Sequence, residues 1–238
     1  MKHAKRLAVV ALTAVMATAI LSGCGKTGGN NSSAAEGGAG QTSSASSSNS
    51  KSVVYTRGNW EGNTYTNSSL GFVFTMPDGW SAKTDDELMA TMDAGYSALT
   101  EEQKKNYDYS KSNSVFDFSA SNADGTNSLG LSVENLALTA GAADLTELDY
   151  AAVLSQQLVQ MADMGYEPGN TYTMDLHGQE YLVLPLKATN LVMPDGTCVC
   201  QDYILRKQDK LMTAFIGTYI EGEEEQFKAF LEENVTAL

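Results

Sequence analysis

Apolar and polar residues alternate along much of residues 53–238, and this pattern predicts β-strands. In residues 129–134, for example, Leu, Leu and Val alternate with Gly, Ser and Glu, as expected for a strand with one buried face and one face towards solvent. Gly, Pro, Asn and Asp clusters separate the apolar runs. On this basis, strands are predicted over residues 65–67, 70–76, 115–119, 129–138, 171–176, 180–189, 197–207 and 211–220.

Three segments have helical rather than strand periodicity. Thr84 with Glu87 and Thr146 with Asp149 form capping-box patterns. Each box precedes apolar residues spaced three or four apart. The expected apolar positions are Leu88, Met92, Tyr96 and Leu99 in the first helix, Tyr150, Leu154, Leu158 and Met161 in the second, and Phe227, Phe230, Leu231 and Val235 in a last helix after Glu221. Gly165 is the predicted C-cap of the second helix.

Two predicted strands, 181–186 and 211–220, are apolar on both faces, which indicates a sheet that is covered on both faces. Short hairpin connections make the sheet mainly antiparallel. The predicted fold class is therefore α+β, a mainly antiparallel sheet covered by helices on both faces in a three-layer sandwich. Pro185 is unusual in a central strand, so an edge or a bulge is expected there.

The first 24 residues have the pattern of an export signal. A basic segment, residues 1–6, precedes an apolar run over 7–21 that is too short to span a bilayer permanently. The run ends in Leu21-Ser22-Gly23-Cys24, which resembles the lipobox of bacterial lipoproteins. The resemblance implies that residues 1–23 are a lipoprotein signal peptide and that Cys24 carries a diacylglyceryl group. Two acyl chains would hold the protein durably on a membrane.

Residues 24–52 are predicted to be a disordered tether, because Ala provides the only apolar side chains among Ser, Gly, Asn, Thr and Gln from Gly25 onward. A coil of this length reaches about 30 Å. Long Ser/Gly tethers after a lipobox are similar to those of Gram-positive lipoproteins, so the outer face of the cell membrane is the expected location. Residues 53–238 are long enough for one domain with a sizeable core.

The acidic composition excludes some partners. The chain has 15 basic and 29 acidic residues and a net charge of −14. Loss of the leader removes three basic residues and no acid, which gives −17, and omission of the tether's Lys26, Lys51 and Glu36 gives −18 for the domain. A nucleic-acid partner is not expected, because such proteins need a basic face.

The start of the predicted domain resembles a known family. The positions that carry the resemblance form the motif Tyr65-x-Asn67-x-x-Leu70-Gly71-Phe72-x-Phe74-x-x-Pro77-x-x-Trp80, which is similar to the opening hairpin of PsbP-like domains. The same opening is found in uncharacterised lipoproteins of gut Firmicutes. Members of the family whose role is known are docking or accessory modules without catalytic residues, so the resemblance implies a non-catalytic role.

No motif in the sequence predicts a catalytic, cofactor-binding or metal-binding residue. Gly-x-Ser-x-Gly is absent, and His177, the one His beyond the leader, is expected in a solvent-facing turn. Residues 122–127 superficially resemble a calcium loop but lack its acidic first ligand and closing Glu, so a hairpin turn is expected. Cys198 and Cys200 are interpreted as unbridged thiols, with a strained bridge, a metal site or catalysis as alternatives.

The sequence thus predicts a lipid-anchored extracytoplasmic binding or accessory module of unknown ligand. Its expected contacts are the membrane, through the lipid on Cys24, and a protein or another component of the cell envelope. Two alternatives stay open at this stage. One is a cell-surface hydrolase with a carboxylate-based site, because acidic pairs are abundant. The other is a domain that responds to divalent cations, because the domain is strongly acidic.

Overall fold

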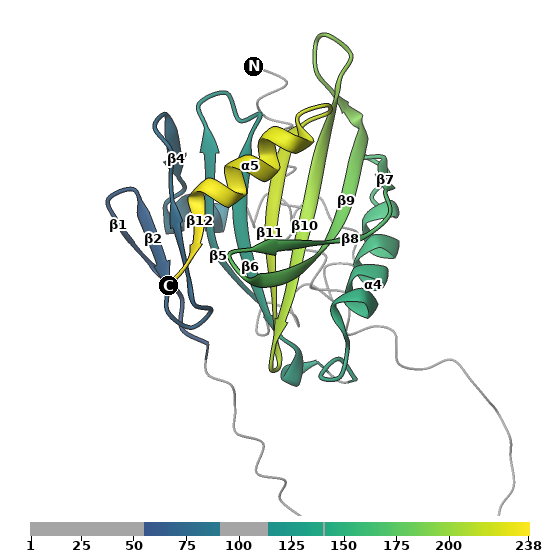
Figure 1. Cartoon of the computed structure of the whole chain (residues 1–238). Helices are drawn as coiled ribbons and strands as arrows, with labels where there is room; N and C mark the ends of the chain where they lie inside the picture. The colour runs from purple at the N-terminus through teal and green to yellow at the C-terminus, as the bar shows by residue number, and fades with distance from the viewer. Residues whose placement is uncertain (1–54, 91–113, 140) are drawn as a thin grey trace, which may run out of the picture.

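The computed structural model describes residues 55–90, 114–139 and 141–238, and these residues form two antiparallel sheets (Figure 1). The signal peptide, Cys24, the tether and the predicted helical positions Met92, Tyr96 and Leu99 lie outside the described residues. The smaller sheet has the strand order β1-β2-β3-β12. Its strands are β1 (Asn59–Glu61), β2 (Thr64–Asn67), β3 (Phe72–Thr75) and β12 (Val235–Ala237).

The larger sheet has the order β4-β5-β6-β11-β10-β9-β7, and β8 also pairs with β9. Short turns join the consecutive pairs β5–β6, β9–β10 and β10–β11, and every pairing in the sheet is antiparallel. The strands are β4 (Trp80–Ala82), β5 (Ser114–Asn122), β6 (Ser128–Asn135), β7 (Tyr166–Pro168), β8 (Tyr172–Leu176), β9 (Gln179–Val192), β10 (Cys198–Gln208) and β11 (Leu211–Ile220). A short 3₁₀ helix, η2 (Leu136–Leu138), follows β6.

Each face of the larger sheet has its own hydrophobic core. On one face, α4 (Glu147–Val159) packs Tyr150, Leu154 and Leu158 against β9, β10 and β11. On the other face, α5 (Glu224–Asn234) packs Phe227 and Leu231 against the sheet, next to apolar residues of β2 and β3. Figure 1 shows α5 crossing in front of the larger sheet and α4 beside β7.

The fold class is confirmed as mainly antiparallel, but cover by helices on both faces is not. In the described part of the chain, helix α5 covers its face together with the smaller sheet, whose Tyr65, Phe72 and Phe74 belong to that core. The predicted hairpin over residues 65–76 forms, with Thr64 paired to Thr75 and Asn67 paired to Phe72. It forms a second sheet that packs on the first.

The absence of a side chain at Gly217 lets α5 pack closely against the larger sheet. A Cβ atom on Gly217 of β11 would lie 2.0 Å from the Phe227 ring, which is far inside van der Waals contact. A glycine is therefore required here for steric reasons. The stacked ring of Tyr219, 4.9 Å from that of Phe227, completes the contact.

The helix starts agree with the sequence and some of the ends do not. Both capping boxes form, at Thr84 with Glu87 and at Thr146 with Asp149. Helix α4 ends at Val159, however, so Gly165 is not its C-cap. Gly165 has φ +61° in the turn that enters β7. Val235 does not belong to the last helix, because it pairs with Phe74 as the first residue of β12.

Pro185 lies at neither an edge nor a bulge of β9. On one side Pro185 is in register with Asp202 of β10. On the other side, β8 pairs with β9 as far as Val183, and β7 pairs from Leu186 onward. Pro185 therefore occupies the gap between two short partners, where its missing N–H leaves no ladder bond unmade, and its carbonyl still accepts from Gly169 N at 2.9 Å.

The prediction of a solvent-facing side for β6 is wrong. Ser132 and Glu134 are 2% and 1% exposed, and Gly130 is buried as well. The polar face of β6 lies on the side of helix α4, where the Tyr150 hydroxyl donates to Glu134. Hydrogen bonding of the buried carboxyl group, rather than solvent, satisfies this face.

Candidate functional site

A buried aspartate, Asp117, organises the most unusual polar cluster of the described residues. The ladder between β5 and β6 shifts register between Phe116 and Phe118. Residues two apart in a regular strand share a face, but Phe116 packs towards the α4 core and Phe118 lies in the α5 core. Asp117 is therefore the extra residue of a β-bulge, a feature that re-aims side chains.

Four side chains donate hydrogen bonds to the Asp117 carboxylate. The hydroxyls of Tyr55 (2.5 Å) and Tyr65 and the amide of Asn67 (2.9 Å) donate to Oδ2, and Arg57 Nε donates to Oδ1 at 3.0 Å. The Asp117 side chain is 0% exposed. A buried carboxyl group without partners would be strongly destabilising, and these donors, together with the Arg57 guanidinium, provide the hydrogen bonds that Asp117 needs in the core.

The two tyrosines act only as donors. Burial raises the pKa of Tyr55 and of Tyr65 well above the usual tyrosine range, and the hydrogen bond to Asp117 raises it further. Both phenols therefore stay protonated at physiological pH. The cluster has the character of a fixed structural network, in which the two phenols serve as hydrogen-bond donors and not as bases.

The donors come from the start of the domain. Tyr55 and Arg57 precede β1, and Tyr65 and Asn67 lie on β2, whereas Asp117 lies on the other sheet. Arg57 also reaches a second element, because its Nη2 donates to the Asp117 carbonyl at 2.7 Å and to Asp85 Oδ1 at 3.1 Å. The cluster therefore attaches Tyr55 and Arg57, near the start of the described residues, to the interface between the two sheets.

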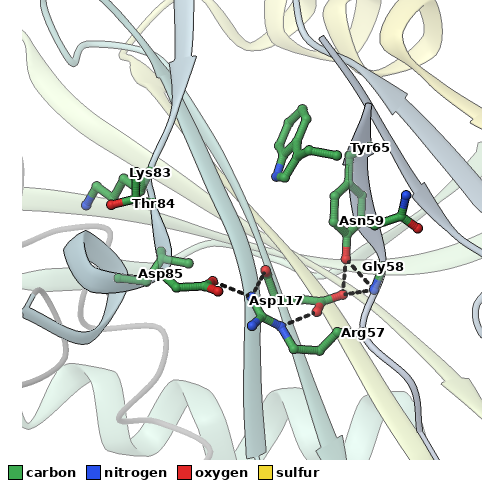
Figure 2. A pocket seen from close by; sticks show the side chains of 10 residues that line it. Arg57, Gly58, Asn59, Tyr65, Lys83, Thr84, Asp85 and Asp117 are labelled. Atoms are coloured by element: carbon green, nitrogen blue, oxygen red, sulfur yellow. Dashed lines mark hydrogen bonds and ion pairs between the residues drawn. The ribbon is translucent and has the colours of Figure 1, made fainter. Parts of the chain in front are cut away.

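A pocket of about 310 Å³ opens beside this cluster. Figure 2 shows Lys83, Thr84 and Asp85 on one side and Gly58, Asn59 and Tyr65 on the other, with Asp117 and Arg57 between them. Trp60 and Leu88 complete the lining. The volume is at the lower end of the range for small-molecule sites, roughly 300–1,000 Å³.

The pocket contains both signs of charge. Burial lowers the pKa of Lys83, and the nearby Glu87 partly offsets this effect. Burial also acts to lower the pKa of Arg57, but its contacts with Asp85 and Asp117 outweigh burial and raise it. The raised pKa keeps Arg57 cationic at neutral pH. The Asp85 side chain is 77% exposed and provides an accessible carboxylate.

Two other carboxyl groups are buried in the cores, and neither lines this pocket. Burial raises the pKa of Glu134 to about 7, against the lowering effect of its Tyr150 and Thr139 hydrogen bonds. Burial likewise raises the pKa of Asp202 to about 6, although Tyr219 donates to it at 2.9 Å. These groups are packed beneath α4 and α5 rather than presented to a substrate.

The raised pKa of Glu134 gives the fold a specific pH dependence. Between its ordinary pKa near 4.5 and about 7, the native state keeps a proton that the unfolded chain loses. This contribution to stability is therefore complete below pH 4.5 and is lost as the pH rises through 7. At pH 8 the free energy of unfolding of Glu134→Gln is expected to exceed that of the wild type by on the order of 2–3 kcal/mol. At pH 4.5 the two should differ little.

Urea denaturation at pH 4.5, 6, 7 and 8 measures this effect, with Glu180→Gln at an exposed position of β9 as the matched control. The control should differ from the wild type by a small amount that does not change with pH. A Glu134→Gln difference that is constant across the series would contradict a proton held on Glu134.

The candidate residues of the sequence analysis do not meet in one place. Cys24 lies outside the described residues. His177 is exposed in the β8–β9 turn, with φ +53°, and contacts the Glu232 carbonyl. Cys198 and Cys200 are both free thiols, and burial raises the pKa of Cys200 to about 12. Asp124 accepts from Thr126 within a tight hairpin turn, as expected for residues 122–127.

Sequence reasoning missed the Asp117 cluster and the pocket. The sequence contains no local signal for the cluster, because Phe116-Asp117-Phe118 has the alternation of a strand with one face towards solvent. The partners of Asp117 precede it by 50 to 62 positions, and no local spacing connects them.

Comparisons with known proteins find similar solved structures but no matching family. The sequence matches no protein-family profile, and no curated protein is similar to it. The solution structure of cyanobacterial PsbP from Synechocystis sp. PCC 6803 is similar at 13% identity with a TM-score of 0.45, and the match covers 74% of this chain and 91% of that one.

Two further solved structures are similar at lower scores. LpqN of Mycobacterium tuberculosis, described as involved in cell envelope biogenesis, has 10% identity and a TM-score of 0.37, over 69% of this chain and 82% of that one. A Bacteroides thetaiotaomicron protein has 12% identity and a TM-score of 0.37, over 75% of this chain and 49% of its own. These values assign no function to this chain. The likeness to lipoproteins of gut Firmicutes stays a prediction.

Proposed function

We propose that this protein is a lipid-anchored, extracytoplasmic binding module without catalytic activity. The observation that carries the proposal is the combination of the Leu-Ser-Gly-Cys24 sequence and Ser/Gly-rich segment with a folded domain that holds a pre-formed pocket. A lipid on Cys24 attaches the chain to the membrane, and the tether holds the pocket on the outer face. The pocket is where a ligand of the cell envelope would bind.

The pocket is better suited to binding than to hydrolysis. A carboxylate-based hydrolase needs two carboxyl groups that face each other across a substrate, one of them with a raised pKa. The carboxyl groups with raised pKa, Glu134 and Asp202, lie in the two cores, and Asp117 is saturated by donors. Asp85 is the accessible carboxylate of the pocket, and it is exposed and paired with Arg57.

The structure also bears on a response to divalent cations. In residues 55–90, 114–139 and 141–238, no group of three or more His, Cys, Asp or Glu side chains is placed to hold a metal ion. No helix of this part of the chain is long and apolar enough to cross a membrane.

Surface labelling of intact cells tests the proposed location. A membrane-impermeant amine reagent should label this protein without lysis, because exposed lysines of the domain would face outward. Mass spectrometry of the N-terminal peptide should find Cys24 as its first residue with a diacylglyceryl group. Labelling that requires lysis, or an unmodified Cys24, would contradict the proposal. A cytoplasmic protein detected in the same sample is the control for lysis.

A further inference from the structure

We propose that the pocket beside Asp117 binds a small zwitterion, either a free amino acid or a dipeptide. This inference rests on the proposed binding function and names its ligand class. The pocket combines an accessible carboxylate, two cationic groups and an apolar wall within about 310 Å³. A zwitterionic ligand has the complementary charges and a side chain for the apolar wall.

Asp85 is the group that would accept the ligand's ammonium. Of the two acids that line the pocket, Asp117 has no exposed side-chain surface, and its oxygens already accept from Tyr55, Tyr65, Asn67 and Arg57. Asp85 uses Oδ1 for Arg57, and its side chain is 77% exposed. Its other oxygen can therefore accept a charge-assisted hydrogen bond from a ligand.

Arg57 and Lys83 would receive the ligand's carboxylate. Arg57 donates from Nε and Nη2 to Asp117 and Asp85. Its Nη1 group keeps two donors for a ligand, and the side chain is 43% exposed. Arg57 is also held in place by these bonds, which reduces the entropy lost on binding. The ammonium of Lys83 is half-buried in the same lining and gains from a nearby anion because burial disfavours its charge.

The apolar part of the lining accommodates a side chain. Trp60, Tyr65 and Leu88 line the pocket together, and the rings of Trp60 and Tyr65 pack edge to face with centroids 5.3 Å apart. Packing fixes these rings before a ligand arrives. Small-molecule sites commonly have such an apolar wall with a few placed polar groups.

The charge of the domain favours a ligand without net charge. The −18 of residues 53–238 repels anions at long range and lowers their local concentration. A purely anionic ligand would be attracted by Arg57 and Lys83 but repelled by Asp85 and by the domain as a whole. A zwitterion has no net charge to repel, and both of its charged groups are paired in the pocket.

Isothermal titration calorimetry on the full mature chain in detergent tests the ligand class. The probes are L-alanine, D-alanine, L-phenylalanine and the dipeptide alanylalanine. Their N-acetylated and carboxamide forms are compared with them, and glucose and N-acetylglucosamine represent neutral polar ligands. At least one unblocked probe should bind, and blocking either end should weaken binding roughly tenfold or more, because each end loses a charge-assisted hydrogen bond.

Two variants and a matched control locate the binding. Asp85→Asn and Lys83→Gln should each weaken binding of the unblocked probe roughly tenfold. Asp86→Asn changes an exposed neighbour outside the lining and should bind as the wild type does. Melting curves without ligand check folding, and Asp85 is suited to the test because exposed ion pairs contribute little to stability.

Binding of the saccharides alone, of blocked and unblocked probes equally, or of no probe would overturn the zwitterion proposal. None of these results would affect the proposed anchor and location, which are tested separately by the modification of Cys24 and by surface labelling. Equal weakening by Asp86→Asn and Asp85→Asn would also overturn the assignment, because it would indicate a general charge effect.

Discussion

Replacing Cys24 with alanine is expected to move this protein from the membrane fraction to the soluble fraction. The predicted tether offers no apolar side chain larger than Ala, and the mature charge of −17 disfavours anionic lipid surfaces. Two acyl chains would be the sole durable attachment, so their loss should change the distribution from almost wholly membrane-bound to almost wholly released. Fractionation followed by immunoblotting measures this distribution.

A second cysteine provides the matched control. Cys198→Ala removes a half-buried thiol at the start of β10 and leaves the Leu-Ser-Gly-Cys24 sequence intact. This variant should stay with the membrane. Persistent membrane association of Cys24→Ala would contradict the lipid anchor and would point to a partner protein in the membrane instead.

Replacing Asp117 with alanine is expected to cause the largest loss of stability of any single change in the candidate site. The substitution leaves the Tyr55, Tyr65 and Asn67 donors without their acceptor and leaves Arg57 without its buried counter-ion. Orphaned buried donors and a broken ion pair together cost about 3–5 kcal/mol. For a domain of this size the melting temperature should fall by roughly 10 °C.

Two further variants make the Asp117 result specific. Asp117→Asn keeps one accepting oxygen and the volume of the side chain, so its loss should lie between the wild type and Asp117→Ala. Asp78→Ala, at an exposed turn, should leave the melting temperature almost unchanged. Thermal melts followed by circular dichroism give all three values. A loss for Asp117→Ala no larger than that for Asp78→Ala would contradict a role for the cluster in stability.

The sequence was informative wherever local chemistry decides the structure. The capping boxes at Thr84 and Thr146 form because their partners are three residues away. The His177-Gly178 and Asp209 turns lie between the predicted strands and have the positive φ values that tight hairpins require. Apolar residues on both faces identified residues 181–186 and 211–220 as parts of central strands, because such a strand must be covered on both sides.

Long-range packing explains what the sequence did not predict. Gly130, Ser132 and Glu134 look like a solvated face, and their burial depends on Tyr150 of a later helix. Pro185 is unexpected in a central strand, and the gap between β7 and β8 explains its position. The pocket unites residues 57–60 with 83–88 and Asp117, and the alternating pattern of a strand contains no information about which distant strand lies beside it.

The position of Asp117 determines how the domain would bear a mechanical load. Arg57 follows Ser52, the last residue of the predicted tether, by five positions, so a pull on the proposed membrane anchor would reach Tyr55 and Arg57 before any strand. Their bonds to Asp117 would carry that force into β5, the second strand of the larger sheet, instead of separating β1 from β2. Because Arg57 and Asp117 also line the pocket, tension in the tether and occupancy of the pocket would act on the same bonds.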